Sequence, residues 1–184
     1  MPQDTDRLIA ITGGPGAGKT SLIEALAAAG HGVRPEAGRT IIRDQQAIGG
    51  RGLPRVDPGL FAELMLAVDL RSHAEALAGH GKIFFDRGLP DIAGYLMLCG
   101  LPIPDHVERA ARQRRYRRAV FIAPPWREIF AQDAERKQDF AEAERTYAAM
   151  AETYPRYGYA LVELPRASVA ERVAFVLNHC PASG

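Results

Sequence analysis

A glycine-rich segment near the start of the chain constrains the fold more than any other part of the sequence. It follows the apolar run 8–11 and reads Gly13-Gly14-Pro15-Gly16-Ala17-Gly18-Lys19-Thr20. Glycines at these positions let the backbone turn tightly and direct successive N–H groups inward, where they form a nest for anionic oxygens. A strand before the segment and a helix over 19–29 after it add the positive end of the helix dipole. The pattern therefore predicts a strand, a phosphate-binding loop and a helix, within an α/β fold that binds a nucleoside triphosphate.

Each residue of this loop has an expected role. Lys19 is expected to reach the β- and γ-phosphates, and the hydroxyl of Thr20 to take one position on Mg²⁺. The residues expected to bind the nucleotide are Gly13, Gly14, Gly16, Ala17, Gly18, Lys19, Thr20 and Ser21. The alternative is a glycine-rich turn that binds nothing, and the strand and helix on either side argue against it.

Chain length and net charge limit the number of domains and the classes of partner that we expect. The 184 residues fit a single domain, residues 1–184, and a net charge of +1 gives no electrostatic reason for a nucleic acid or a membrane surface as partner. The N-terminus carries neither a basic region nor an apolar one, and no apolar run approaches a membrane span. Cys99 and Cys180 lie far apart, as expected for reduced thiols. We therefore expect a soluble cytoplasmic protein.

Short apolar runs alternate with longer helical patterns, which predicts a three-layer αβα sandwich around a parallel five-stranded sheet. Strands are expected at 8–12, 31–35, 82–86, 118–123 and 159–164. Helices are also expected at 60–78, 90–99, 104–115, 139–154 and 168–179, the last with a capping box from Ser168 and Glu171. Residues 48–55 are expected to form a surface loop. The basic run 109–118 has no interleaved aromatic residues and is interpreted as a solvated helix face.

Residues just after the strands are the candidates for chemistry, because the carboxyl ends of parallel strands meet at one edge of the sheet. Asp86 ends an apolar strand, where it could support Mg²⁺, accept the proton of an attacking hydroxyl, or simply cap the next helix. Arg87 could bind a phosphate or carboxylate of the acceptor, or hold Asp86 in position. Asp91 and Tyr95 share one face of the next helix, where they are candidates for the acceptor pocket or simply an exposed acid and a core tyrosine.

Two further segments carry candidate residues. Glu36 follows the second strand and Arg39 comes three residues later, so the pair could bind a hydroxylated acceptor, complete a metal shell, or form a structural ion pair. Residues 126–138 are polar and follow the fourth strand, as expected for a lid over the phosphates or for an ordinary charged helix. In a lid, Arg136 or Arg127 would neutralise charge in the transition state.

One absent motif narrows the class of protein. No N-K-x-D motif occurs, because the only asparagine is Asn178. A guanine-specific switch GTPase is therefore not expected, and 184 residues leave little room for the additional parts of a motor ATPase. A small kinase needs neither the guanine-specific motif nor these additional parts.

These motifs, with Glu36-Ala37-Gly38-Arg39, Asp86-Arg87-Gly88-Leu89-Pro90-Asp91 and Glu135-Arg136-Lys137-Gln138, carry a family resemblance. The chain resembles the small single-domain P-loop ATPases and kinases related to the ribosylnicotinamide kinase domain and, more distantly, nucleoside and nucleotide kinases. The resemblance covers essentially the whole chain. It implies the strand order 2-3-1-4-5, an Asp86–Arg87 pair facing the acceptor and the metal, Arg136 as the lid arginine, and residues 165–167 near the adenine.

The leading hypothesis is an ATP- and Mg²⁺-dependent phosphotransferase acting on a small hydroxylated metabolite, above all a nucleoside or nucleotide. Lys19, Asp86 and Arg136 are its expected catalytic residues, and Thr20 and Asp86 its expected metal ligands. The expected acceptor-binding residues are Glu36, Arg39, Arg87 and Asp91. The rival hypothesis is a regulatory, AAA-like ATPase whose hydrolysis is read by a protein partner. A module that acts on a nucleic-acid end is a third, weaker one, and a homodimer is left open.

Overall fold

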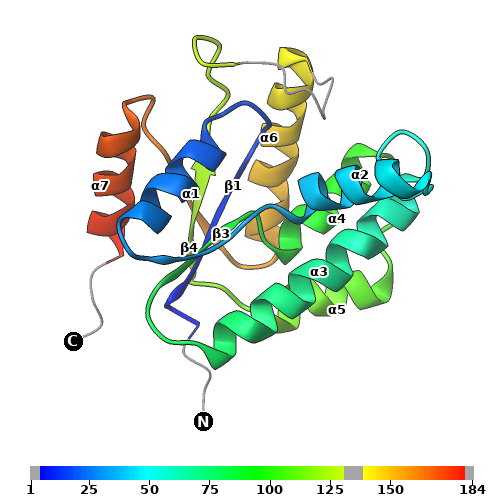
Figure 1. The fold of residues 1–184 in the computed structure, drawn as a ribbon, viewed down its shortest axis with the longest axis horizontal. Coiled ribbons are helices and arrows are strands. Elements are labelled where there is room, and N and C mark those ends of the chain that lie inside the picture. Colours follow the sequence, from blue (N-terminus) through cyan, green and yellow to red (C-terminus); the bar gives the residue numbers. More distant parts are fainter. Residues whose placement is uncertain (1–4, 131–138, 181–184) are drawn as a thin grey trace.

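A parallel sheet of five strands forms the centre of the molecule in the computed structural model, which describes residues 5–130 and 139–180 (Figure 1). The strands are β1 (Leu8–Gly13), β2 (Gly32–Arg34), β3 (Ile83–Asp86), β4 (Ala119–Ala123) and β5 (Ala160–Glu163). Their order in the sheet is β2-β3-β1-β4-β5, and every neighbouring pair is parallel. The predicted strand order is thus confirmed, and it places β1 and its phosphate loop in the middle of the sheet.

Helices cover both faces of the sheet and make the three predicted layers. Helices α1 (Lys19–Ala28) and α7 (Val169–His179) pack together on one face, on the left of Figure 1. The other face carries α3 (Pro58–Ala78), α4 (Leu89–Leu98), α5 (Asp105–Gln113) and α6 (Phe140–Arg156). Helix α2 (Ala37–Ile48) packs against α3. No helix within the described ranges is both long and apolar enough to cross a membrane.

The central strand β1 is buried on both faces, as expected for a parallel sheet. Its side chains alternate: Leu8 and Ala10 join the core under α3–α6, whereas Ile9 and Ile11 join the core under α1 and α7. The period of two in a strand explains this division. A third, smaller apolar cluster lies between α2 and α3 and includes Ile41, Ile42 and Phe61.

The helix and strand boundaries differ from the predictions by a few residues, with one larger difference. Helix α2 was expected only as a segment carrying Arg39, and it extends to Ile48, where Gly49 ends it with a φ of 64°. Helix α3 begins two residues earlier than predicted, because Asp57 accepts a hydrogen bond from the Leu60 N–H (2.9 Å). The predicted capping box at the start of α7 is confirmed.

The basic run 109–118 uses several arginines within the structure itself. Arg115 stacks 4.0 Å from the ring centre of Tyr159 and donates a 2.8 Å hydrogen bond to the carbonyl of Tyr157. Arg112 lies over the Tyr157 ring, and Arg117 donates to the carbonyl of His179. These contacts join α5 and the segment before β4 to the segment before β5 and to the end of α7, so three arginines of the run have structural roles.

Candidate functional site

The phosphate loop connects the end of β1 to the first residue of α1. Gly16 and Gly18 have φ values of 67° and 76°, a left-handed conformation that glycine adopts without steric cost. The helix begins at Lys19, so its unpaired N–H groups face the same space as the loop amides. All the residues predicted to bind the nucleotide, 13–21, therefore lie in one strand–loop–helix unit.

Three side chains of this unit were predicted to act on the phosphates or bind the nucleotide. Lys19 is buried, with 5 % of its surface exposed, and its Nζ donates a 2.7 Å hydrogen bond to the carbonyl of Gly14. The Lys19 side chain thus folds back over the loop whose bound phosphates it is expected to contact. Thr20 and Ser21 lie exposed in the first turn of α1.

Asp86 ends β3 beside this loop and is 7 % exposed. Its Oδ1 atom is buried and has no hydrogen-bond partner within the described residues. Burial raises the pKa of Asp86 to about 6, although the nearby charge of Lys19 lowers it. A carboxylate oxygen of this kind and the hydroxyl of Thr20 are the hard oxygen ligands that Mg²⁺ prefers. The donor chemistry of the two residues fits a magnesium ion, and their role as its ligands stays a prediction.

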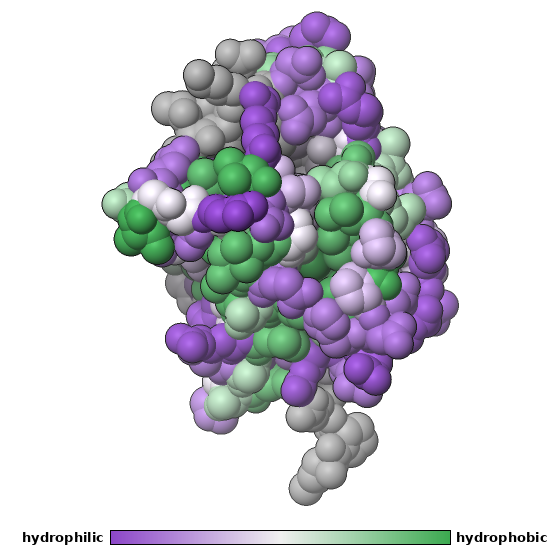
Figure 2. All heavy atoms as spheres, turned by 90° about the vertical axis from the view of Figure 1, so that its right-hand side faces the viewer, coloured by the Kyte–Doolittle hydropathy of each residue, from purple (hydrophilic) through white to green (hydrophobic). Residues whose placement is uncertain are grey.

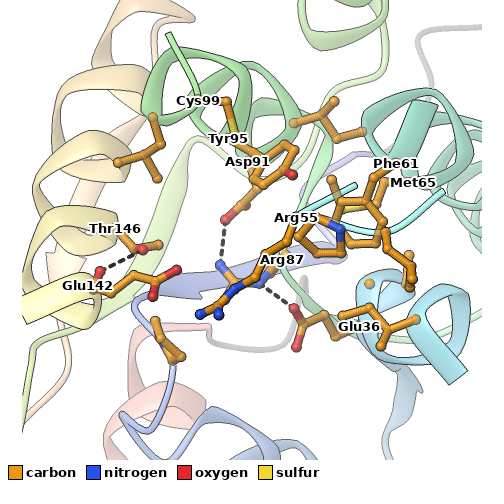
Figure 3. A pocket seen from close by; sticks show the side chains of 18 of the residues that line it. Glu36, Arg55, Phe61, Met65, Arg87, Asp91, Tyr95, Cys99, Glu142 and Thr146 are labelled. Atoms are coloured by element: carbon orange, nitrogen blue, oxygen red, sulfur yellow. Dashed lines mark hydrogen bonds and ion pairs between the residues drawn. The ribbon is translucent and has the colours of Figure 1, made fainter. Parts of the chain in front are cut away.

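Arg87 connects the phosphate loop to residues of α4 and of the start of α2. Its φ of 77° is the only positive value of a non-glycine residue within the described chain. The guanidinium donates from Nη1 to the carbonyl of Gly13 (2.9 Å) and to Asp91 Oδ1 (3.1 Å), and from Nε to Glu36 Oε1 (2.9 Å). Figure 3 shows Arg87 between these two carboxylates. The carboxylates keep the pKa of Arg87 above its ordinary value in spite of burial.

Asp91 lies at the centre of a buried hydrogen-bond network. Its Oδ1 accepts from the Thr12 hydroxyl (2.6 Å) as well as from Arg87, and its Oδ2 accepts from the Gly88 N–H (2.9 Å) and the Tyr154 hydroxyl (2.6 Å). Four donors use the lone pairs of both oxygens. Asp91 is among the residues that line the pocket, but its carboxylate binds other protein groups. Direct binding of an acceptor by Asp91 stays a prediction.

The predicted Glu36–Arg39 pair forms at the start of α2, with a distance of 3.7 Å between Arg39 Nε and Glu36 Oε2. Glu36 is the N-cap residue of the helix and lines the pocket. Arg39 is not among the pocket-lining residues. Of the three interpretations of this pair, the ion pair is present, and Glu36 is the member that lines the pocket; binding of an acceptor or a metal stays a prediction.

A pocket of about 540 Å³ opens beside the phosphate loop, between α2, α3, α4 and α6. Pro15, Glu36 and Arg87 line the end next to the loop. Apolar and aromatic side chains form much of its wall; they include Ile42, Phe61, Met65, Ile92, Tyr95, Leu98 and Met150. Figure 2 shows hydrophobic residues gathered in the middle of this side of the molecule, with hydrophilic residues around them. The volume suits a small organic molecule.

Asp69 lines the same pocket from α3, and the sequence analysis missed it. Burial, with the charges of Asp91 and Glu36, raises the pKa of Asp69 to about 8. Asp69 as a whole residue is half-buried, and it forms part of the pocket wall. Its signal in the sequence is one acidic residue in an otherwise apolar helical stretch, 64–70.

The predicted lid can be placed only in part. Arg136 lies outside the described residues. Arg127 stacks 4.0 Å from the ring centre of Phe140 at the start of α6. Phe130 lies against the phosphate loop, since a Cβ added at Gly16 would come within 2.5 Å of its ring. The segment after β4 therefore reaches the phosphate loop, as a lid would require.

Residues 8–172 match the AAA domain family in sequence, and they include every described site residue above. The chain belongs to this family. Among solved structures, this AAA domain chain resembles deoxyadenosine kinase from M. mycoides with the products dCMP and dCDP bound. The TM-score is 0.67 at 16 % identity, over 94 % of this chain and 97 % of that one.

The same kinase with bound dATP gives a TM-score of 0.62 at 15 % identity, again over 94 % and 97 % of the two chains. At these identities the likeness shows the fold. The AAA domain chain thus has the P-loop fold of a nucleotide kinase. A comparison with curated proteins finds no match.

Proposed function

We propose that this chain is an ATP- and Mg²⁺-dependent phosphotransferase whose acceptor is a small hydroxylated metabolite, a nucleoside or a nucleotide. One observation carries the proposal: the 540 Å³ pocket begins at Pro15 of the phosphate loop and at Glu36 and Arg87. A second small molecule in this pocket would present its hydroxyl to the γ-phosphate. A protein that only hydrolyses ATP needs no such space. The likeness to a deoxyadenosine kinase fold supports a nucleoside or nucleotide as the acceptor.

The proposed reaction moves one phosphoryl group. The acceptor hydroxyl oxygen bonds to the γ-phosphorus, the bond from that phosphorus to the bridging oxygen of ADP breaks, and a carboxylate receives the hydroxyl proton. Glu36 lies on the pocket wall, where Arg87 holds it, and we assign it to the acceptor hydroxyl. Lys19 would leave Gly14 to neutralise the β- and γ-phosphates. Arg136 is included as the lid arginine on the basis of the sequence.

Thr20 and Asp86 would hold Mg²⁺, which supplies positive charge to the phosphates when it is bound. The buried Oδ1 of Asp86, which has no hydrogen-bond partner in the part of the chain that the structure describes, supports this assignment. The same carboxylate could instead take the acceptor proton. Asp86→Asn separates the two roles, because loss of a metal ligand weakens Mg²⁺-dependent ATP binding, whereas loss of a proton acceptor lowers kcat alone.

The test is ADP release from MgATP, with and without a panel of nucleosides, nucleotides and sugars. We expect one class of acceptor to raise ADP release above the water background and to yield a phosphorylated product. Lys19→Ala should abolish the activity. Lys82→Ala is the matched control. Lys82 directly precedes β3, at the amino end of the strand, whereas the phosphate loop follows the carboxyl end of β1. Its side chain contacts the carbonyl of Cys180.

Glu36→Gln tests the acceptor side separately. It should keep ATP binding while it lowers acceptor-dependent turnover. Slow hydrolysis that no acceptor stimulates would contradict the proposal and favour the regulatory ATPase. A cytoplasmic location stays part of the proposal.

A further inference from the structure

Arg172 reaches the phosphate loop from the helix layer opposite the acceptor pocket. It belongs to α7, which packs beside α1, and 2 % of its surface is exposed. Its Nη2 donates to the carbonyl of Ala17 (3.1 Å), and its Nη1 lies 3.4 Å from the carbonyl of Gly18. The guanidinium therefore lies against the outer side of the loop, where the two carbonyl groups point.

Arg172 packs closely against Gly18. A Cβ added at Gly18 would lie 2.6 Å from Arg172 Nη1 and 3.1 Å from Ile129 Cδ1. Both α7 and the segment after β4 thus approach Gly18 on the side where a Cβ would stand. The contact with Arg172 is part of a packed environment around the loop.

The charge of Arg172 is buried, and no carboxylate of the described residues pairs with it. A guanidinium stays charged in proteins, and burying a charge is unfavourable unless an opposite charge compensates. No acidic side chain in the ranges 5–130 and 139–180 forms an ion pair with Arg172. Its Nε atom is buried and has no hydrogen-bond partner there either, and burial lowers the pKa of the side chain. An anion bound in the loop would supply the missing negative charge.

Peptide geometry relates the carbonyl contacts to the phosphate side of the loop. The described chain contains no cis peptide bond, so the N–H and C=O of each peptide group point in opposite directions. The carbonyls of Ala17 and Gly18 share their peptide groups with the N–H groups of Gly18 and Lys19. Arg172 holds the Ala17 carbonyl, and it shares the Gly18 carbonyl with the Leu22 N–H (3.3 Å). The N–H groups of Gly18 and Lys19 consequently point the opposite way. Donation to a carbonyl also polarises the peptide and strengthens its N–H as a donor.

We propose that Arg172 is a positioning residue for the polyphosphate chain of the nucleotide, acting through the peptide groups Ala17–Gly18 and Gly18–Lys19. The inference rests on the proposed nucleotide site and adds α7 to it. The ligand class is a di- or triphosphate, because only a group that enters the loop can use these two N–H donors. Arg172 itself stays behind the loop and does not touch the ligand.

The test measures binding of MgATP and of inorganic tripolyphosphate by titration calorimetry, together with the Tm of each apo protein. Arg172→Met should weaken binding of both ligands roughly 10- to 100-fold, the range for a hydrogen-bonded charge. Arg172→Lys restores the charge with fewer fixed donors, and its affinities should lie between those of Arg172→Met and the wild type. Arg117→Met is the matched control, since Arg117 also donates to a carbonyl of α7, that of His179, but at the far end of the helix.

Each possible outcome either supports or overturns the proposed role of Arg172. A lower Tm with unchanged affinity for tripolyphosphate in Arg172→Met would overturn the proposal and make Arg172 a packing residue only. If Arg172→Met does not fold, Arg172→Lys decides: weaker binding at a native Tm supports the proposal, and wild-type affinity overturns it. Failure of the wild-type protein to bind either probe would overturn this inference and the proposed function together.

Discussion

The hydroxyl of Tyr154 gives the sharpest test of the buried network around Asp91. It donates a 2.6 Å hydrogen bond from α6 to Asp91 Oδ2, and the tyrosine has no exposed surface. Tyr154→Phe removes only this hydroxyl and preserves the shape of the core. In the variant, Asp91 Oδ2 still accepts the hydrogen bond from the Gly88 N–H (2.9 Å), so this oxygen loses one of its two donors and keeps the other.

The expected loss follows from the kind of bond. A buried hydrogen bond to a charged group contributes about 1.5–3 kcal/mol. We expect Tyr154→Phe to lower the free energy of unfolding by about 2 kcal/mol, or roughly 4–8 °C in Tm for a chain of this size. Urea unfolding at pH 7 measures the first quantity and calorimetry the second. The acceptor KM should rise as well, because Asp91 also holds Arg87 (3.1 Å).

Tyr147→Phe is the matched control. Tyr147 also donates to a carboxylate, that of Glu163 at 2.5 Å, but this pair lies at the surface. Solvent screening limits such a bond to below about 1 kcal/mol. The reasoning would be refuted if the two variants lost equal stability, or if Tyr154→Phe lost less than about 0.5 kcal/mol, the size of an ordinary surface change.

Two further predictions concern the pocket and the packing of the loop. Burial and neighbouring carboxylates raise the pKa of Asp69 to about 8, so the folded protein holds a proton there that the unfolded chain releases near pH 4. Relative to Asp69→Asn, the free energy of unfolding of the wild type should therefore fall by about 1.4 kcal/mol per pH unit between about pH 5 and 7.5. Above about pH 9 the difference between the two proteins should stay constant. Urea titrations that give parallel pH profiles for the two proteins would contradict this. Gly14→Ala should unfold at a much lower urea concentration than Gly94→Ala, because the added Cβ meets the carbonyl of Ala143 at 2.3 Å in the first case and the flexible end of Met150 at 2.7 Å in the second. Equal midpoints would show that the backbone around Gly14 moves aside.

The sequence predicts the fold well where local signals and the family resemblance agree. The strand before the phosphate loop and the loop itself depend on residues close together in the chain, and both are confirmed. Helix α2 was expected only around Arg39. The four residues that follow Ile42 are all polar, so few apolar positions mark the second half of the helix. The short strand β2 lies at the edge of the sheet, where fewer residues need to be apolar, and it is one residue shorter at each end than the predicted range 31–35.

The site was less predictable, because its central contacts join distant parts of the chain. Spacing within α4 places Asp91 near the pocket, but nothing in the sequence pairs it with Tyr154, 63 residues later. Arg172 contacts Ala17 across 155 residues, and its position in α7 resembles an ordinary polar helix site. Local patterns reveal which residues can bind phosphate. They do not reveal which residues hold them in place.

Arg87 shows why this second group matters for function. A left-handed conformation at a residue with a side chain is strained by about 1–2 kcal/mol. At a φ of 77° the guanidinium reaches Gly13 at the phosphate loop, Glu36 at the pocket wall and Asp91 in the core. One side chain thereby fixes the distance between the loop and the acceptor side. Because phosphoryl transfer depends on positioning more than on covalent chemistry, this strained residue is where the fold and the proposed reaction are most closely linked.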